Sequence, residues 1–534
     1  MAAAIAVPVI VFGLGRYHWF LRDDWDLLAG RSLTDPVSMM RPYAEHWVVL
    51  PAVLYRVNWQ LFGINTYVPY QVLPVLAHVG AATMLRLLMR RHGVQPWIAT
   101  AAAGTFLLFG AGSQNLVWAF QAGMTGSIFF GLAQVVVADH DGPIGRRDGA
   151  AVLLGILAMF GSAVGAVLVG VTAVAILARR GWRAALLQAA PPLTIFGIWY
   201  AWSAPYRANA MGRPSMSVIA DWIGQGISGT FEAVGQQPWI AVTLGLVLVI
   251  GLPLAWWPLR GRELLRAAAI PMLLLGAMVG FNLITAASRG VFGAEFARQS
   301  RYLHTNAAFL LVPLAVAADA VARAIDRAVP RAATNPLAAV RVGTILIVGL
   351  FLLPIPANIA AFDKTGQVFG PGYFDQQRAL VVALARSPLV DQVSKDLVPI
   401  HDPYGGDKIT AGWLAAGARD GLIPTGSPPS AALTAEVTVR LGVRQSIGDP
   451  LTTNCRTVER SIDLKPTKGQ RYSIRTSVTI GALTEGKPVG SPVPFDVQNG
   501  YNLRVEVDGL HLRIASVAAA PGLPAAASFS LCAA

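Results

Sequence analysis

Long apolar runs, separated by short polar segments, occupy the first two thirds of the chain. An apolar helix of about 18 or more residues is long enough to cross the hydrocarbon core of a bilayer. The first run is not followed by a small-residue cleavage site, so we interpret it as a membrane span and not as a signal peptide. The pattern predicts about eleven spans in all. They are residues 1–17, 66–89, 95–113, 121–138, 149–162, 164–178, 184–202, 238–257, 264–285, 304–322 and 341–360.

The pattern changes after this membrane domain of residues 1–360. Residues 361–432 have helical spacing that ends at the breaker run TGSPPS, which predicts a helical connector. In residues 433–534, apolar and polar positions alternate with a period of two, as is typical of half-buried strands. Several short antiparallel strands of this kind close into a β-sandwich or jelly roll. The predicted strands lie in EVTVRLGV, SIDLKP, YSIRTSVTIGAL, PVPFDV and NLRVEVDGLHLRIASVA.

Composition and charge indicate that most of this chain lies in lipid. Only 13% of its residues are charged and 54% are hydrophobic, whereas soluble domains average about 25% charged residues. Arginines cluster after every second span, and such clusters favour the cytoplasmic side. We therefore predict a cytoplasmic N-terminus and an extracytoplasmic C-terminal domain, and we attribute the net charge of +13 to membrane topology and not to nucleic-acid binding. The clusters are Arg86, Arg90 and Arg91; Arg146 and Arg147; Arg179, Arg180 and Arg183; Arg260, Arg262 and Arg266; and Arg323, Arg327, Arg331 and Arg341.

The two cysteines, Cys455 and Cys532, both lie in the predicted β-domain. Two cysteines confined to one soluble domain fit a single disulfide in an oxidising compartment, which agrees with the predicted topology. Two unpaired buried thiols are the alternative. The sequence contains no phosphate-binding loop, HExxH motif, EF-hand loop or Cys/His metal cluster. The predicted spans contain almost no carboxylates, which argues against an ion-coupled transporter.

The strongest candidate chemistry follows the first span, in residues 18–65. Asp23, Asp24 and Asp26 lie just outside the predicted helix, where a carboxylate can reach both a lipid-linked reactant and an aqueous acceptor. Asp23 or Asp24 is therefore a candidate general base that takes a proton from an attacking hydroxyl. A solvated charge cluster that ends the helix is the alternative.

A second motif in the same segment is Glu45-His46-Trp47. His46 is a candidate to assist the base or to bind a phosphate, although a lone His beside Trp is more often an interface anchor. Residues Glu45 to Phe62 have helical apolar spacing, which predicts a helix that lies in the membrane interface or re-enters the membrane.

Two further segments face the same predicted side of the membrane. Arg301 and Arg298 lie near the start of the tenth span, where a guanidinium and free backbone N–H groups suit a phosphate; arginines that snorkel to lipid headgroups are the alternative. The turn between the third and fourth spans offers hydrogen bonds and a stacking surface for a sugar, or it is an ordinary turn with an aromatic anchor. Its candidate residues are Gln114, Asn115, Trp118 and Gln121, and Arg56 is a weaker candidate for the same cavity.

The stretch RDDWDLL…EHWVVLPAVLYR, followed by GAGSQNLVWAFQ and SRYLH, resembles a group of actinobacterial membrane glycosyltransferases of the GT-C superfamily. The resemblance covers about residues 1–360. It implies a multi-pass enzyme of the inner cell membrane that acts in cell-wall biosynthesis. The implied reaction is inverting transfer of arabinofuranose or mannose from a polyprenyl-phosphate donor, such as a decaprenyl-phosphate sugar, to a cell-envelope glycan or lipoglycan. The C-terminal domain is similar to the carbohydrate-binding-like modules of mycobacterial arabinosyltransferases.

The resemblance also implies residue roles. It makes Asp24 or Asp23 the general base, with Asp24 favoured. Arg301, helped by Arg298 or His46, would hold the donor phosphate. No cofactor and no obligatory metal are expected, although some relatives use a divalent ion at the acidic loop. The other implied contacts are Tyr302 to the donor phosphate and Glu45 and His304 to the sugar or acceptor. A non-enzymatic membrane transporter or scaffold for envelope glycolipids is the alternative function.

Overall fold

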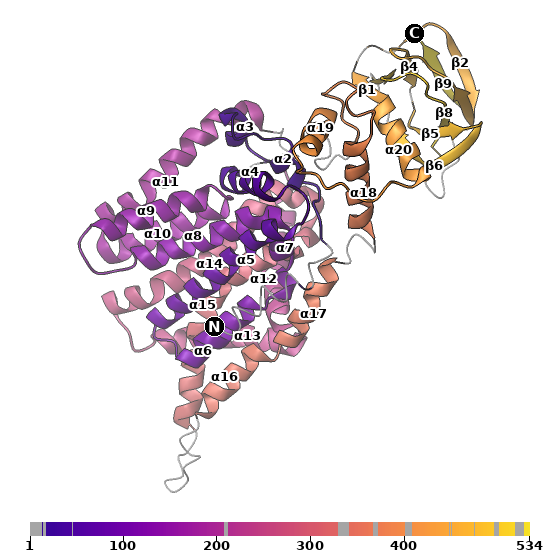
Figure 1. Cartoon of the computed structure of the whole chain (residues 1–534). Coiled ribbons are helices and arrows are strands. Elements are labelled where there is room, and N and C mark those ends of the chain that lie inside the picture. The colour runs from indigo at the N-terminus through magenta and orange to yellow at the C-terminus, as the bar shows by residue number, and fades with distance from the viewer. Residues whose placement is uncertain are drawn as a thin grey trace. The chain divides into compact units, whose positions relative to one another are not determined.

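A computed structural model describes most of the chain (Figure 1). The predicted first span lies outside the described residues, apart from Gly13. The described residues are 13, 18–44, 46–207, 212–328, 341–366, 372–400, 408–447, 449, 451–474, 476–495, 501–517 and 528–534.

The chain divides into two compact units. The first, which we call the membrane unit, comprises Met1–His18, Leu33–Leu54 and Val68–Gly370. The second, the C-terminal unit, comprises Trp19–Ser32, Tyr55–Tyr67 and Pro371–Ala534. The acidic residues near the N-terminus therefore belong to the same unit as the β-rich end of the chain.

Each predicted span from the second to the tenth coincides with one α-helix. The last predicted span is divided into two helices at Pro354, because proline has no N–H to continue the helical hydrogen bonding. The helices are α5 (Val68–Arg91), α6 (Pro96–Leu107), α8 (Ala122–Ala138), α9 (Arg146–Met159), α10 (Val164–Arg180), α11 (Trp182–Trp202), α13 (Pro238–Trp256), α14 (Gly261–Arg289), α15 (Ser300–Ala328), α16 (Val342–Leu352) and α17 (Ile355–Gly366).

Seven stretches among the described residues are long and apolar enough to cross a membrane. The helices α6, α9 and α10 are shorter, at 12, 14 and 17 residues. The protein is thus a multi-pass α-helical membrane protein that ends in a β-rich domain.

The central helix of the membrane unit is α15, in which every residue from Tyr302 to Ala320 is buried. It packs against α13, α14 and α16. A Cβ atom at Gly251 of α13 would lie 2.3 Å from a backbone oxygen of α15, and one at Gly343 of α16 would lie 2.2 Å from another. Small residues at such crossings let helices approach closely within a membrane.

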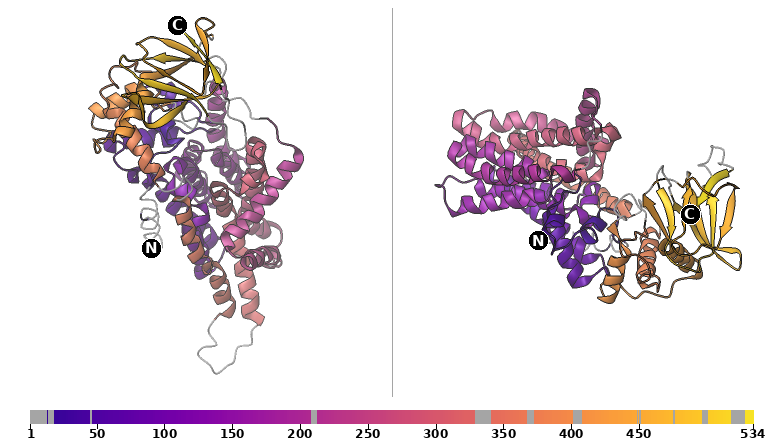
Figure 2. Two further views of the ribbon diagram at one scale, coloured as in Figure 1. Left: turned by 90° about the vertical axis from the view of Figure 1, so that its right-hand side faces the viewer. Right: turned by 90° about the horizontal axis from the view of Figure 1, so that it is seen from above.

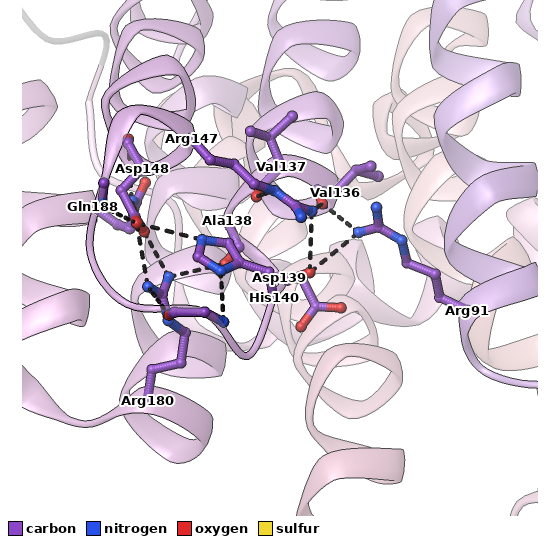
Figure 3. Close-up of polar contacts among 12 residues, drawn as sticks. Arg91, Val136, Val137, Ala138, Asp139, His140, Arg147, Asp148, Arg180 and Gln188 are labelled. Carbon is purple, nitrogen blue, oxygen red and sulfur yellow. Dashed lines mark hydrogen bonds and ion pairs between the residues drawn. The ribbon is translucent and has the colours of Figure 1, made fainter.

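Four of the predicted basic loops meet at one end of the membrane unit. Figure 3 shows an arginine from three of them, Arg91, Arg147 and Arg180. Arg91, at the end of α5, donates to carbonyl oxygens at the C-terminal end of α8. Arg180 of α10 pairs with Asp148 of α9 at 2.6 Å, and Arg266 of α14 lies 3.8 Å from Asp141. Cations are favourable at helix C-termini. The arginine clusters that follow every second span in the sequence therefore gather at the same end of the membrane unit, as the positive-inside rule predicts.

Short elements and the 20-residue helix α12 connect the other helices of the membrane unit. The predicted helix within Glu45 to Phe62 is confirmed as α4, which begins in the membrane unit and ends in the C-terminal unit. The elements are α3 (Pro36–Met40), α4 (Val49–Phe62), η1 (Gly110–Gly112), α7 (Gln114–Val117), η2 (Ala119–Gln121), η3 (Ala204–Tyr206), α12 (Met216–Gly235), η4 (Gly290–Phe292) and η5 (Ala294–Arg298).

Among its described residues, the C-terminal unit contains the short acidic helix α2 (Asp24–Leu28), the end of α4, three further helices and two antiparallel sheets. The sheets have the strand orders β1-β7-β4-β9-β2 and β3-β8-β5-β6, and they face each other in Figure 2. Cys455 and Cys532, predicted to pair, are opposite each other on β2 and β9 and form a disulfide. The elements are α18 (Tyr373–Arg386), α19 (Ala411–Arg419), α20 (Ala431–Gly442), β1 (Val443–Ile447), β2 (Cys455–Glu459), β3 (Ser461–Leu464), β4 (Arg471–Ile474), β5 (Val478–Thr484), β6 (Lys487–Phe495), β7 (Tyr501–Val505), β8 (Leu512–Ser516) and β9 (Ser528–Ala533).

One predicted strand is wrong. The segment EVTVRLGV was predicted as a strand from its alternating valines, but most of it lies in the helix α20. Ser430 caps this helix by accepting a hydrogen bond from the N–H of Leu433 at 3.2 Å. Glu436 and Arg440 form an ion pair one helical turn apart, at 2.8 Å. These local interactions favour the helix over the strand that the β-branched residues suggest.

Candidate active site

The carboxylate of Asp24 is the most enclosed polar group of the acidic segment. Asp24 begins α2 and is fully buried. Its Oδ2 accepts hydrogen bonds from the N–H of Leu21 at 2.9 Å and from the hydroxyl of Tyr67 at 3.0 Å. Its Oδ1 accepts a hydrogen bond from the hydroxyl of Tyr55. Three donors from three parts of the segment therefore converge on one carboxylate.

The electrostatic setting of Asp24 is unusual for an aspartate. Burial raises its pKa from the usual 3.8 to about 7, against the hydrogen bonds from Tyr55, Leu21 and Tyr67, which lower it. Burial and the Asp24 charge also raise the pKa of Tyr55, which keeps that phenol a hydrogen-bond donor. A carboxyl with a strongly perturbed pKa outside the membrane spans is a candidate functional group.

The neighbouring carboxylates of α2 have different environments. Asp23 stands at the N-cap position of α2 and is half-buried. Asp26 is buried, and its Oδ2 pairs with the Arg31 guanidinium at 2.8 Å. The side chain of Arg31 is 0% exposed. Asp26 is therefore neutralised by a buried ion pair, whereas Asp23 is the carboxylate of this group with the greatest access to solvent.

The acidic segment is held by the connector that precedes the β-domain. Trp413 of α19 stacks on Trp59 of α4, with ring centroids 4.7 Å apart, and meets the ring of Trp25 edge-on at 6.2 Å. The N–H of Ile64 donates to the carbonyl oxygen of Leu422 at 2.8 Å. The segments around α2 and the end of α4 thus pack directly against residues 411–422.

Arg56 of α4 supports α2 from another side. Its guanidinium donates to the carbonyl oxygen of Leu28, the last residue of α2, and lies 5.9 Å from the centroid of the Trp59 ring. A cation is favourable at a helix C-terminus. The predicted sugar-binding role of Arg56 stays a prediction. The observed contacts show that this side chain joins α4 to the end of α2.

The membrane unit carries the second group of predicted residues, at the start of α15. The Arg301 guanidinium is half-buried and lies 4.9 Å from the ring centroid of Tyr302 and 5.5 Å from that of Phe296. Within the described part of the chain, no hydrogen-bond acceptor or carboxylate contacts this guanidinium. The contacts of Arg301 leave its N–H donors available to an anion. Tyr302 itself is buried among aromatic rings.

Arg298, predicted as a second phosphate ligand, has its donors occupied. Its guanidinium grips Glu232 of α12 with two hydrogen bonds, of 2.6 and 3.2 Å. The same guanidinium donates to Gln225 and Ser228 on the same helix. The hydrogen bond from Arg298 lowers the pKa of Glu232. In this structure Arg298 fastens the segment before α15 to α12 and offers little to a ligand.

The turn at α7 contacts α15 directly. Asn115 is buried, and its Nδ2 lies 3.1 Å from the carbonyl oxygen of Arg301 and 3.1 Å from Nδ1 of His304. The N–H of Gln114 donates to the Ser300 hydroxyl at 3.1 Å. Asn115 and His304, predicted as sugar contacts, therefore meet each other.

The remaining predicted residues have simpler surroundings. Trp118 is half-buried and packs on the ring of Phe120 at 5.6 Å, and Gln121 is buried at the start of α8. His46 pairs with Tyr43 through two backbone hydrogen bonds. Glu45 lies outside the described residues. Among the residues with described positions, no group of three or more His, Cys, Asp and Glu is placed to hold a metal ion.

Sequence reasoning missed several residues of this arrangement. Tyr67 is an ordinary aromatic in a segment rich in aromatics, and Glu232 lies 66 positions from Arg298, so neither carries a signal of its own. Trp413 belongs to a helix that resembles any soluble amphipathic helix. His78, whose Nδ1 lies 3.0 Å from Nε2 of His304, had a usable signal, because an ionisable residue within a predicted span is a functional candidate by default.

No model of a known protein family matches the chain, and no curated protein matches it. Among solved structures, the chain is similar to the crystal structure of ArnT from Cupriavidus metallidurans in the apo state, at 16% sequence identity and a TM-score of 0.43. The similarity covers 86% of this chain and 95% of that chain.

Proposed function

We propose that the protein is a membrane glycosyltransferase of the GT-C type that moves a sugar from a polyprenyl-phosphate donor to an envelope glycan or lipoglycan. The observation that carries the proposal is the acidic loop. Two adjacent carboxylates lie outside the membrane spans, and one of them, Asp24, is buried with a pKa of about 7. A buried carboxylate with a perturbed pKa marks a candidate functional site, and a more exposed carboxylate directly beside it can act as a general base.

The two aspartates take different roles in this proposal. Both oxygens of Asp24 are occupied by donors, and the residue is 0% exposed, so Asp24 acts as a positioning residue that holds the start of α2. Asp23 is half-buried and takes the proton. A general base must come within hydrogen-bonding reach of the hydroxyl that it deprotonates, and accessibility favours Asp23 for that task.

The reaction is a displacement at the anomeric carbon. The acceptor oxygen attacks this carbon from the face opposite the phosphate, so the configuration inverts. The bond between the anomeric carbon and the phosphate oxygen breaks, the proton of the acceptor hydroxyl passes to Asp23, and polyprenyl phosphate leaves with the bonding electrons. No cofactor enters this balance.

The leaving phosphate needs a positive partner, and Arg301 is the proposed one. A guanidinium binds phosphate oxygens through two parallel N–H donors, and a fixed cation stabilises the charge that develops on a leaving group. The support is that Arg301 has no carboxylate partner among the described residues, whereas Arg298 is paired with Glu232.

The test is sugar transfer by the purified full chain with a panel of polyprenyl-phosphate sugars that includes arabinofuranose and mannose. We expect turnover with at least one donor, a loss of 100-fold or more for Asp23→Asn in line with the loss of a general base, and a smaller loss for Asp24→Asn. Asp35→Asn is the matched control, because Asp35 is an exposed helix cap whose replacement by Asn keeps the cap. Full activity in both the Asp23 and Asp24 variants, or no turnover with any donor by the wild-type protein, would refute the proposal.

A further inference from the structure

Three side chains and two backbone carbonyl groups in the membrane unit form one continuous buried chain of hydrogen bonds. Nδ2 of Asn115 lies 3.1 Å from Nδ1 of His304, Nε2 of His304 lies 3.0 Å from Nδ1 of His78, and Nε2 of His78 lies 3.1 Å from the carbonyl oxygen of Leu107. All three side chains are 0% exposed. The chain joins α7, α15, α5 and the end of α6.

The two ends of the chain determine where its protons lie. Both ends are backbone carbonyl oxygens, of Arg301 and of Leu107, and a carbonyl oxygen only accepts. Nε2 of His78 must therefore carry a proton, so its Nδ1 accepts from Nε2–H of His304. Nδ1 of His304 then accepts from the amide of Asn115. A single arrangement satisfies every link: two neutral imidazoles, each protonated on Nε2.

The chain ends on the backbone of the proposed phosphate ligand. The amide of Asn115 donates to the carbonyl oxygen of Arg301 at 3.1 Å, and the Thr305 hydroxyl donates to the same oxygen at 3.1 Å. The N–H of Gln114 also donates to the hydroxyl of Ser300, the residue before Arg301. The backbone at the start of α15 is thus fixed from a neighbouring turn, while the Arg301 guanidinium lies over the rings of Phe296 and Tyr302.

We infer that Asn115, His304 and His78 are positioning residues that fix Arg301 for the phosphate of the donor. The inference rests on the proposed function. A site works when its ligands are held by supporting hydrogen bonds before the substrate arrives. The chain supplies this support, because a shift of the Arg301 backbone would break the bond to Asn115 and leave buried polar groups without partners.

A purely structural role makes a different prediction. If the chain only joins helices, then breaking it lowers stability and leaves binding of a phosphate unchanged in the protein that remains folded. If it positions Arg301, then breaking it weakens binding of a phosphate more than binding of the same lipid without its phosphate.

The first measurement is independent of the proposed activity. Nitrogen-15 NMR of the full chain in nanodiscs, labelled at histidine, reports the protonation of each ring nitrogen, and the signals of His78 and His304 are identified by their loss in His78→Asn and His304→Asn. We expect both rings to be neutral and protonated on Nε2 at pH 7. A charged ring, or a ring protonated on Nδ1, overturns the inferred chain.

The second measurement compares farnesyl phosphate with farnesol, which lacks the phosphate, as probes that bind to the full chain. We expect Arg301→Met to weaken binding of farnesyl phosphate by 10-fold or more, and Asn115→Ala and His304→Ala to weaken it by 5-fold or more, with binding of farnesol unchanged. Asn115→Asp keeps the shape of the side chain but should weaken binding of farnesyl phosphate as Asn115→Ala does. Its carboxylate has no N–H to donate and would face two acceptors, the carbonyl oxygen of Arg301 and Nδ1 of His304. Gln134→Leu is the control, since Gln134 is a buried, hydrogen-bonded amide outside the chain.

The outcomes separate the two proposals. Equal binding of farnesyl phosphate and farnesol by the wild-type protein overturns the proposed donor site and this inference with it. A preference for the phosphate that Arg301→Met abolishes, but that Asn115→Ala and His304→Ala both retain, overturns only the inference that these residues position Arg301.

Discussion

Tyr67 and Asp24 are joined by a hydrogen bond of 3.0 Å, which the tyrosine hydroxyl donates to Oδ2 of the buried carboxylate. This bond lowers the pKa of Asp24, whereas burial raises it to about 7. The phenol of Tyr67 therefore helps to determine the pH at which the acidic loop carries its charge.

Replacing this phenol should move the pH dependence of the protein upward. Tyr67→Phe removes one donor to the carboxylate, so the pKa of Asp24 should rise further. A hydrogen bond to a charged group contributes about 1.5–3 kcal/mol, and one pKa unit corresponds to about 1.4 kcal/mol. Asp24 accepts these hydrogen bonds and holds the start of α2 as a charged carboxylate, so its protonation should disturb the position of the base, Asp23. We therefore expect the acid limb of the pH profile of sugar transfer to move up by about one unit. Tyr472→Phe, which removes a buried phenol from the β-domain, should leave the profile in place. An unchanged acid limb in Tyr67→Phe would contradict the assigned role of the bond.

Asp24 should also make stability fall with rising pH. Its pKa is about 7 in the folded protein against 3.8 for an ordinary aspartate, so the folded state binds the extra proton between these values. The resulting stabilisation is complete below pH 3.8 and is lost as the pH rises to about 7. Thermal unfolding at pH 5 and pH 8 measures the change. We expect a larger decrease in melting temperature for the wild-type protein than for Asp24→Asn, and equal decreases would exclude Asp24 as the cause.

The buried pair of Asp26 and Arg31 gives a prediction about folding that is independent of activity. Arg31→Met leaves the Asp26 carboxylate buried without its cation, and breaking a buried pair in this way costs about 3–5 kcal/mol. The double variant Asp26→Leu with Arg31→Met should recover most of the loss, because it removes both charges. Denaturant unfolding of the full chain measures both effects.

A matched surface pair provides the comparison. Arg419 and Asp391 form an ion pair of 3.1 Å in which both side chains are more than half exposed, and such pairs contribute little. Arg419→Met should therefore cause a much smaller loss of stability than Arg31→Met. Comparable losses at the two sites would show that the Asp26–Arg31 pair is not effectively buried.

The helices of the membrane unit could be predicted because lipid places one requirement on every span. A stretch such as Pro238–Trp256 must be apolar along its whole length, so its position is visible without any knowledge of its neighbours. The segment EVTVRLGV shows the opposite case. Its alternating valines favour a strand, but a serine cap and an ion pair within one turn stabilise the helix α20 instead. The free energies of these local interactions and of strand formation are similar in size, so the sequence alone does not show which structure is the more stable.

The sequence predicted which residue types occur in the candidate site. It did not predict which of these residues form hydrogen bonds or ion pairs with one another. Asp23 and Asp24 are the same residue type at adjacent positions. They differ in the structure because Asp24 is fully buried and accepts hydrogen bonds from Tyr55 and Tyr67. Arg298 and Arg301 likewise look equivalent until Glu232, far away in sequence, is seen to occupy the first. Such distinctions depend on long-range contacts, which one sequence does not reveal.

The turn after α4 offers the sharpest test of how the connector supports the acidic loop. Gly63 has a φ of +56°, and a Cβ atom added there would lie 2.0 Å from the carbonyl oxygen of Leu422. That oxygen accepts the hydrogen bond from Ile64, the residue after Gly63. Gly63→Ala therefore adds a collision to the backbone strain and should separate the turn from the connector.

Gly421 isolates the strain from the collision. It has a φ of +71° with nothing within 4 Å of an added Cβ atom, so Gly421→Ala should cost only the strain of the left-handed conformation, about 1–2 kcal/mol. We expect Gly63→Ala to lower the melting temperature further, to expose residues 411–422 to limited proteolysis, and to reduce sugar transfer. If the two alanine variants lost the same stability and activity, the contact between Gly63 and Leu422 would not be what holds the acidic loop, because the strain common to both would then account for the whole effect.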